Sequence, residues 1–154
     1  MRPTAPLSGL SVTAWIIIIN VVVHLLASTI FAYSPSPFGY GRWSRLHDLG
    51  HFSTAKAFFD IQSDGKLILN LQVWRFVTFQ FLHDLGSIWH IVLNMFGLWI
   101  FGRTVEQYLG GKKYLAFYLV CGIFGALLYL LLNLLGSMGL HIPGVMMSDP
   151  HTPL

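Results

Sequence analysis

Three hydrogen-bonding side chains, His83, His90 and Asn94, recur along a strongly apolar stretch of the sequence. His90 and Asn94 are four residues apart, so on an α-helix they lie on one face about a turn apart, and His83 falls near the same face. A neutral histidine and an asparagine can both donate hydrogen bonds. Two such donors can converge on one oxygen that becomes negative during acyl transfer. The stripe has donors but no nucleophile, so it would form one half of a hydrolase site.

The same spacing is also compatible with a purely structural role. Polar side chains inside a membrane helix normally face a cavity or a partner, and their hydrogen bonds often bridge neighbouring helices. Two interpretations therefore stay open on spacing alone: an oxyanion site in a polar recess shared with other helices, and a helix–helix contact. Which of them applies depends on the elements that carry the stripe.

The composition indicates that these elements lie in a membrane. The chain has 154 residues, of which 55% are hydrophobic and 10% charged, whereas a soluble domain carries about 25% charged residues. The nine Lys and Arg are dispersed, which argues against nucleic-acid binding because that function needs a clustered basic footprint. Anionic lipid headgroups account for the net charge of +3. We therefore expect membrane lipid, and no nucleic acid, as a partner.

Stretches free of Asp, Glu, Lys and Arg, the second of which (85–102) is taken with its flanks, indicate three apolar spans, which we place at residues 10–32, 87–105 and 114–135. A helix of about 23 residues rises roughly 35 Å, enough to cross a hydrocarbon core about 30 Å thick. We therefore predict an all-α membrane protein with three transmembrane helices, the first retained as an anchor and not cleaved as a signal peptide. The density of Lys and Arg after the second span predicts a cytoplasmic location for that short loop and for the N-terminus.

The segment between the first two spans, residues 33–74, is too apolar for a linker in water. We predict that it lies at the membrane interface as short amphipathic helices with aromatic anchors. Its His47 and His51 are four residues apart, but no third ligand is evident, so we interpret them as solvated loop histidines and expect no metal site. The membrane domain would then extend over residues 10–135, with tails at 1–9 and 136–154.

Two further features of the spans predict packing and not chemistry. A helix-packing face is indicated by the small residues of the third span, Cys121, Gly122, Gly125 and Ala126. Glu106 stands near the C-terminal end of the second span, where a carboxylate opposes the helix dipole. We expect it to act as a structural clamp whose charge is compensated by nearby groups. The candidates are Arg103, Lys112, Lys113 and the backbone N–H groups of the Gly110-Gly111 turn.

Three sequence blocks, taken together, resemble the rhomboid intramembrane serine proteases. They are Trp74-Arg75-Phe76-Val77-Thr78 leading to Phe81-Leu82-His83, an H-x-x-x-N motif at His90 and Asn94, and a G-x-x-x-E-x-x-x-G motif at Gly102, Glu106 and Gly110. The resemblance implies a six-helix core, a cytoplasmic N-terminus, and cleavage of membrane-anchored proteins by a Ser–His dyad without a cofactor. It also implies that His90 and Asn94 form the oxyanion hole. Structural roles are expected for Arg75, His83, Gly102, Glu106 and Gly110.

The sequence departs from the family pattern at the nucleophile. Ser148 stands where the G-x-S-G serine would fall, but Met146 and Asp149 occupy the two glycine positions, where glycine would let the backbone pack tightly. The chain reaches only Leu154, so we expect a truncated N-terminal half without the fourth to sixth helices and their histidine base. Ser148 is then a candidate nucleophile by position only, because an unactivated serine is a poor nucleophile.

Three functions remain open at this stage. The first is a rhomboid serine endopeptidase acting on transmembrane proteins, with this chain inactive as it stands. The second is a rhomboid-like pseudoprotease that binds membrane clients without cleaving them. The third is a structural membrane subunit. All three predict a multi-pass integral membrane protein, located in the inner membrane if the source is bacterial.

Overall fold

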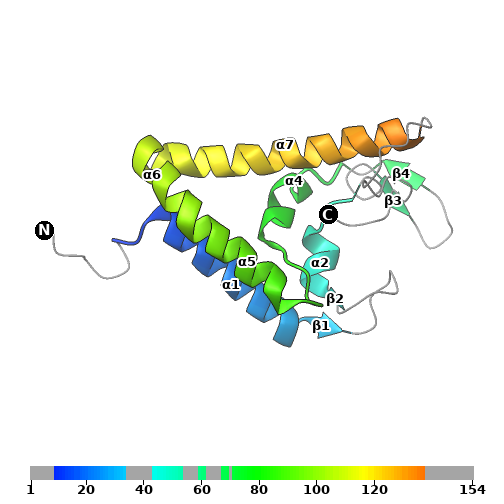
Figure 1. The fold of residues 1–154 in the computed structure, drawn as a ribbon. Helices are drawn as coiled ribbons and strands as arrows, with labels where there is room; N and C mark the ends of the chain where they lie inside the picture. Colours follow the sequence, from blue (N-terminus) through cyan, green and yellow to red (C-terminus); the bar gives the residue numbers. More distant parts are fainter. Residues whose placement is uncertain (1–8, 34–42, 54–58, 62–66, 70, 138–154) are drawn as a thin grey trace, which may run out of the picture. The chain divides into compact units, whose positions relative to one another are not determined.

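The computed structural model describes residues 9–33, 43–53, 59–61, 67–69 and 71–137. Three of its helices are long and apolar enough to cross a membrane: Val12–Thr29, Ile88–Leu109 and Gly111–Gly136. The predicted helical membrane architecture with three spans is therefore confirmed (Figure 1). The chain divides into two compact units, one of Met1–Ser44 with His83–Tyr118 and one of Arg45–Leu82 with Leu119–Leu154.

The first unit begins with helix α1, Val12–Thr29. Its N-cap is Ser11, whose hydroxyl oxygen accepts a hydrogen bond from the backbone N–H of Ala14 at 3.1 Å, as a helix start requires. One side of α1 is buried at helical spacing, by Thr13, Ile16, Asn20, His24 and Ala27. Apolar side chains such as Trp15, Ile19 and Leu25 are exposed around the rest of the helix, which suits a surface in contact with lipid. After α1, strand β1 (Ala32–Tyr33) pairs antiparallel with β2 (Trp43–Ser44).

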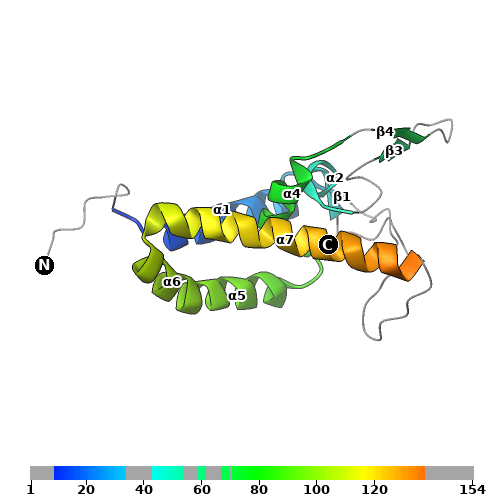
Figure 2. The same ribbon diagram turned by 90° about the horizontal axis from the view of Figure 1, so that it is seen from above.

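The second span is one helical path made of three segments. They are α5 (Ile88–Gly97), a π-helical turn η2 (Leu98–Gly102) and α6 (Arg103–Leu109). In Figures 1 and 2 this path runs from α5 to α6. The sequence predicted an uninterrupted helix over 87–105, because an apolar pattern does not reveal a π turn. The path ends at Gly110, whose φ of 76° is a conformation that favours glycine. Helix α7, Gly111–Ser137, follows at once.

The second unit is built around an aromatic cluster. It contains α2 (Arg45–Gly50), the antiparallel strands β3 (Phe59–Ile61) and β4 (Leu67–Leu69), α4 (Arg75–Thr78), η1 (Phe79–Phe81) and the C-terminal part of α7; β3 and β4 lie side by side in Figure 2. Phe52 is fully buried, and its ring centroid lies 4.7 Å from that of Phe76, 5.7 Å from that of Phe79 and 6.2 Å from that of Tyr129. The segment in which we expected short amphipathic helices therefore contains strands as well.

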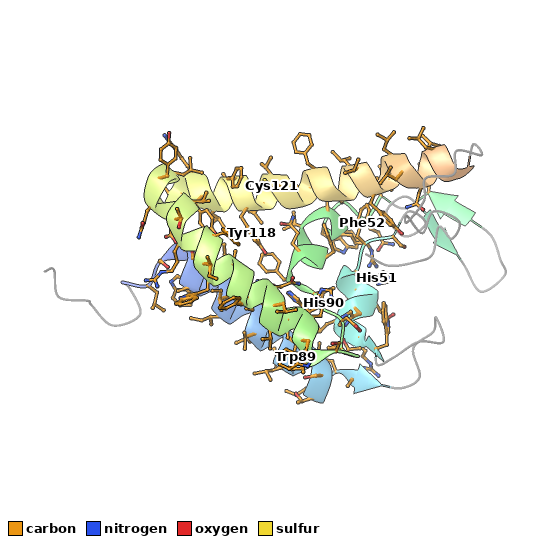
Figure 3. The ribbon with its side chains drawn as sticks, in the orientation of Figure 1. His51, Phe52, Trp89, His90, Tyr118 and Cys121 are labelled. Atoms are coloured by element: carbon orange, nitrogen blue, oxygen red, sulfur yellow. The ribbon has the colours of Figure 1, made fainter. Side chains whose placement is uncertain are left out.

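The two loop histidines are not solvated, which corrects the prediction. His47 and His51 are both buried, and the Nδ1 atom of the His51 ring hydrogen-bonds the carbonyl oxygen of His47. Their four-residue spacing brings one side chain onto the backbone of the other within and just after α2 (His51 and Phe52 are labelled in Figure 3). No cluster of three His, Cys, Asp or Glu residues that could hold a metal occurs among the residues that the structure describes.

The predicted small-residue face of α7 divides into two faces. Gly122 and Ala126 point inward: Ala126 is fully buried, and a Cβ on Gly122 would lie 1.9 Å from Cδ of Gln80. Cys121 is exposed, and a Cβ on Gly125 would have nothing within 4 Å. Only the pair Gly122 and Ala126 therefore serves as a packing face. It admits the Gln80 side chain, whose Nε2 donates to the carbonyl oxygens of Phe76 at 3.0 Å and Leu119 at 3.2 Å.

A Gly122→Ala variant tests this packing. The added methyl group must displace Gln80 and remove its hydrogen bond to α7, so we expect the free energy of unfolding to fall by about 1–3 kcal/mol. Thermal unfolding in detergent micelles measures the change. Gly125→Ala is the matched control and should be neutral or slightly stabilising, because its methyl group enters open space and alanine favours a helix. Equal unfolding temperatures for the two variants would contradict the packing of Gly122 against Gln80.

Candidate active site

The Trp-Arg-x-x-Thr block acts as a cap on helix α2. The last carbonyl groups of a helix have no partner within it and need donors from elsewhere. Here four consecutive carbonyls, of residues 48–51, each accept a hydrogen bond from a side chain of residues 74–78. The pairs are Arg75 Nη2 with Asp48 (2.8 Å), Trp74 Nε1 with Leu49 (3.1 Å), Thr78 Oγ1 with Gly50 (2.9 Å) and Arg75 Nη1 with His51 (2.8 Å). The remaining guanidinium nitrogen donates to Gln72 Oε1 at 2.6 Å.

His90 and Asn94 stand on α5 one turn apart, and both side chains are exposed, whereas the neighbouring Ile91 is buried. The ring of the buried His83 meets the ring of His90 edge-on, with 5.7 Å between the centroids and 84° between the planes. In Figure 3, His90 and Trp89 are labelled at the N-terminal end of α5. The structure thus brings His83 and His90 into contact. The polar recess that we expected around His90 and Asn94 stays a prediction.

Glu106 holds the start of α1. Its Oε1 accepts a hydrogen bond from the backbone N–H of Val12 at 2.7 Å, and its Oε2 accepts from the N–H and the hydroxyl of Thr13 at 2.9 and 2.6 Å. The first N–H groups of a helix lack partners within the helix, and its N-terminus favours negative charge. Our expected compensation by Arg103, Lys112, Lys113 or the following turn is therefore replaced by α1, which lies 93 and 94 residues earlier in the chain.

A Glu106→Gln variant tests this anchor. The amide keeps an acceptor oxygen but loses the charge and presents an NH₂ group to donors, so we expect the free energy of unfolding to fall by about 1–2 kcal/mol. The unfolding midpoint in micelles gives the difference. Gln107 is the exposed neighbour, and Gln107→Ala should change stability by less than about 0.5 kcal/mol. A Glu106→Gln midpoint equal to that of Gln107→Ala would show that the hydrogen bonds to α1 contribute little.

The two glycines of the G-x-x-x-E-x-x-x-G motif are needed for different structural reasons. Gly102 is buried, and a Cβ there would lie 2.5 Å from the hydroxyl of Tyr114 and 3.1 Å from Cγ2 of Thr13. Gly110 is instead required by its positive φ. Both therefore serve the geometry at the end of the second span that is opposite to His90.

Sequence reasoning missed the polar side of α1. Thr13, Asn20 and His24 are all buried there. The spacing of Asn20 and His24, four residues apart within an apolar span, is the signal that could have found them. Ser148, the positional candidate for the nucleophile, lies outside the described residues, as does the rest of the segment 138–154.

Comparison with known proteins identifies the class to which this fold and site belong. Residues 70–146, half of the chain, match the Rhomboid domain, and the chain belongs to the rhomboid family of integral membrane proteins. It is 40% identical over 64 residues to Rhomboid-like protease 3 of Toxoplasma gondii, 42% of this chain and 24% of that protein. It is 36% identical over 63 residues to RHOMBOID-like protein 6, mitochondrial, of Arabidopsis thaliana, 41% of this chain and 20% of that protein.

A bacterial rhomboid protease is also similar to part of this chain. Rhomboid protease GlpG of Yersinia pestis is 39% identical over 54 residues, which cover 35% of this chain and 19% of that protein. The chain thus spans about a quarter or less of the length of these relatives. No solved structure matches the chain closely enough to add to the comparison.

Proposed function

We propose that the chain supplies the oxyanion-binding side of a rhomboid intramembrane serine protease that cleaves membrane-anchored proteins. The observation that carries the proposal is the pair His90 and Asn94, one turn apart on the exposed side of α5. They lie within the residues that match the Rhomboid domain. An exposed polar pair in an apolar span is costly unless another group covers it. The carbonyl group of a substrate is such a group.

The chemistry follows from the donors. When a serine attacks the scissile carbonyl carbon, the carbonyl oxygen becomes negative, and hydrogen bonds aimed at that oxygen lower the barrier. Asn94 offers its NH₂ group, and His90 offers a ring N–H in its neutral form. The edge-on contact with His83 limits the orientation of the His90 ring. His83 is thus a positioning residue in this proposal, and no metal or cofactor is needed.

The nucleophile is not assigned to residues 1–154. Ser148 has Met146 and Asp149 where the family motif has glycines, and Ser148 lies with His141 and His151 outside the described residues. We therefore propose that residues 1–154 alone do not cleave substrates. The protease function would depend on a serine and a histidine base supplied in addition to His90 and Asn94.

A serine-directed probe tests this division of roles. We expect no labelling of the purified 154-residue chain by a fluorophosphonate, because a serine without an activating base is a poor nucleophile. We also expect the coding sequence downstream of Leu154 to encode G-x-S-G and a later membrane histidine. Mass spectrometry of the probe-treated chain and the reading frame of the gene are the measurements. Labelling at Ser148 would contradict the proposal that residues 1–154 lack the nucleophile. A downstream sequence without the motif would contradict the proposed protease function.

A non-catalytic function is the second candidate, favoured by Met146 and Asp149 in place of the motif glycines. In that case His90 and Asn94 would hold a membrane client without cutting it. Co-purification separates the candidates. An uncleaved client that stays bound to the wild-type chain, and is lost on Asn94→Ala, supports binding. A cleaved client supports proteolysis.

A further inference from the structure

The buried side of α1 is polar along most of its length. Thr13, Asn20 and His24 are 1%, 0% and 8% exposed, and they follow one another at helical spacing. Ile16 is the one other buried residue of α1 between Thr13 and Asn20. The distance along the axis from Thr13 to His24 is about 16 Å, roughly half of the hydrocarbon thickness. A membrane helix thus directs a row of hydrogen-bonding groups inward and not toward lipid.

Two tyrosines at the start of α7 line the same row. The Tyr114 hydroxyl and Thr13 Cγ2 both lie beside Gly102, at 2.5 and 3.1 Å from the position of a Cβ on that glycine. One turn further along α7, the Tyr118 hydroxyl interacts with the side chain of Asn20, and Tyr118 is labelled in Figure 3. We call the set Thr13, Asn20, His24, Tyr114 and Tyr118 the α1 seam.

Three atoms of the α1 seam have no hydrogen-bond partner among the described residues. They are Asn20 Oδ1, His24 Nδ1 and the Tyr114 hydroxyl, and each is buried. The neighbouring Asn20 Nδ2 is satisfied by the carbonyl oxygen of Ile16 at 2.8 Å. Buried polar atoms in folded proteins almost always have a partner, either a protein group or an ordered water. Three unsatisfied atoms along one helix face therefore indicate a ligand that can both donate and accept.

We propose that ordered water molecules occupy the α1 seam. Water can donate to Asn20 Oδ1, exchange hydrogen bonds with the Tyr114 hydroxyl, and either donate to or accept from His24 Nδ1. Lipid chains offer no such groups, and the seam side chains contain no carboxylate or thiolate to favour a metal ion. One end of the seam is Thr13, beside Glu106, and the other is His24, which lies within electrostatic range of Asp84. The waters would thus form a row along α1 inside the first unit, which we call the hydrated file. This proposal holds whether or not the chain takes part in proteolysis.

Hydroxyl-radical footprinting of the full chain in micelles tests the proposal, because radiolysis of bound water oxidises the side chains beside it. We expect clear oxidation of Tyr114 and His24 despite their burial, and of the half-buried Tyr118. Phe52 is the dry control, an aromatic side chain that is fully buried among other rings. Labelling of Tyr114 as low as that of Phe52 would overturn the proposal.

Two variants extend the test. Asn20→Leu replaces the amide by an apolar group of similar size, and it should reduce the oxidation of Tyr118 and His24 several-fold while the exposed Trp15 is oxidised as before; unchanged oxidation at the two seam residues would overturn the hydrated file. If Asn20→Leu does not fold, Tyr114→Phe tests whether water occupies the α1 seam. In a hydrated seam it removes a water partner and lowers Tm by about 2–4 °C. In a dry seam it removes an unsatisfied hydroxyl, so an unchanged or raised Tm would overturn the proposal.

Discussion

Replacing Arg75 by methionine is expected to lower the free energy of unfolding by about 3–5 kcal/mol, because each buried acceptor left without a donor costs about 1–3 kcal/mol. Three acceptors lose the hydrogen bond from Arg75: the carbonyl oxygens of Asp48 and His51, and Oε1 of Gln72. Methionine keeps much of the volume of the side chain, so the loss reports the hydrogen bonds more than the packing. Denaturant titration in micelles, followed by helical circular dichroism, measures the difference.

Arg75→Lys is the informative control for this prediction. Lysine keeps the positive charge but replaces the planar fork by a single ammonium group, which cannot reach all three acceptors in the same geometry. We expect it to recover less than half of the lost stability. Full recovery by lysine would mean that charge matters and the fork does not. A methionine variant as stable as the wild type would contradict the capping of α2 by Arg75.

In a preparation that contains the complete protease, Asn94→Ala and His90→Ala are each expected to lower kcat by about 10²–10³-fold, the loss typical of one oxyanion donor. KM should change little, because the hydrogen bonds strengthen only as the negative charge develops. Cleavage of a transmembrane substrate in vesicles gives both constants. This prediction depends on the proposed function.

Stability separates a catalytic role of these residues from a structural one. Both side chains are exposed on α5, so the unfolding temperature should stay close to that of the wild type. Leu93→Ala is the matched control, since Leu93 lies between the two residues and is 62% exposed, and it should retain most of the activity. If Asn94→Ala unfolds the protein, or if Leu93→Ala lowers kcat as much, the two residues bridge helices and do not serve an oxyanion.

The sequence by itself determined the features that depend on neighbours along the chain. Charge-free apolar stretches predicted the three spans, with ends that differ from those of the structure by only a few residues. The four-residue spacing of His90 and Asn94 predicted their common helix, and the three motif blocks predicted the rhomboid family, which the Rhomboid domain match confirms.

Only the tertiary structure decided which groups compensate one another. Glu106 binds the start of α1 from 93 and 94 residues away, and Arg75 caps carbonyls 24 and 27 residues earlier. It also decided that His47 and His51 are buried, and that Gly122 and Gly125 face different surroundings. The physical reason is that hydrophobic periodicity is local, whereas a buried hydrogen-bonding group takes whichever partner the packed chain brings within about 3 Å.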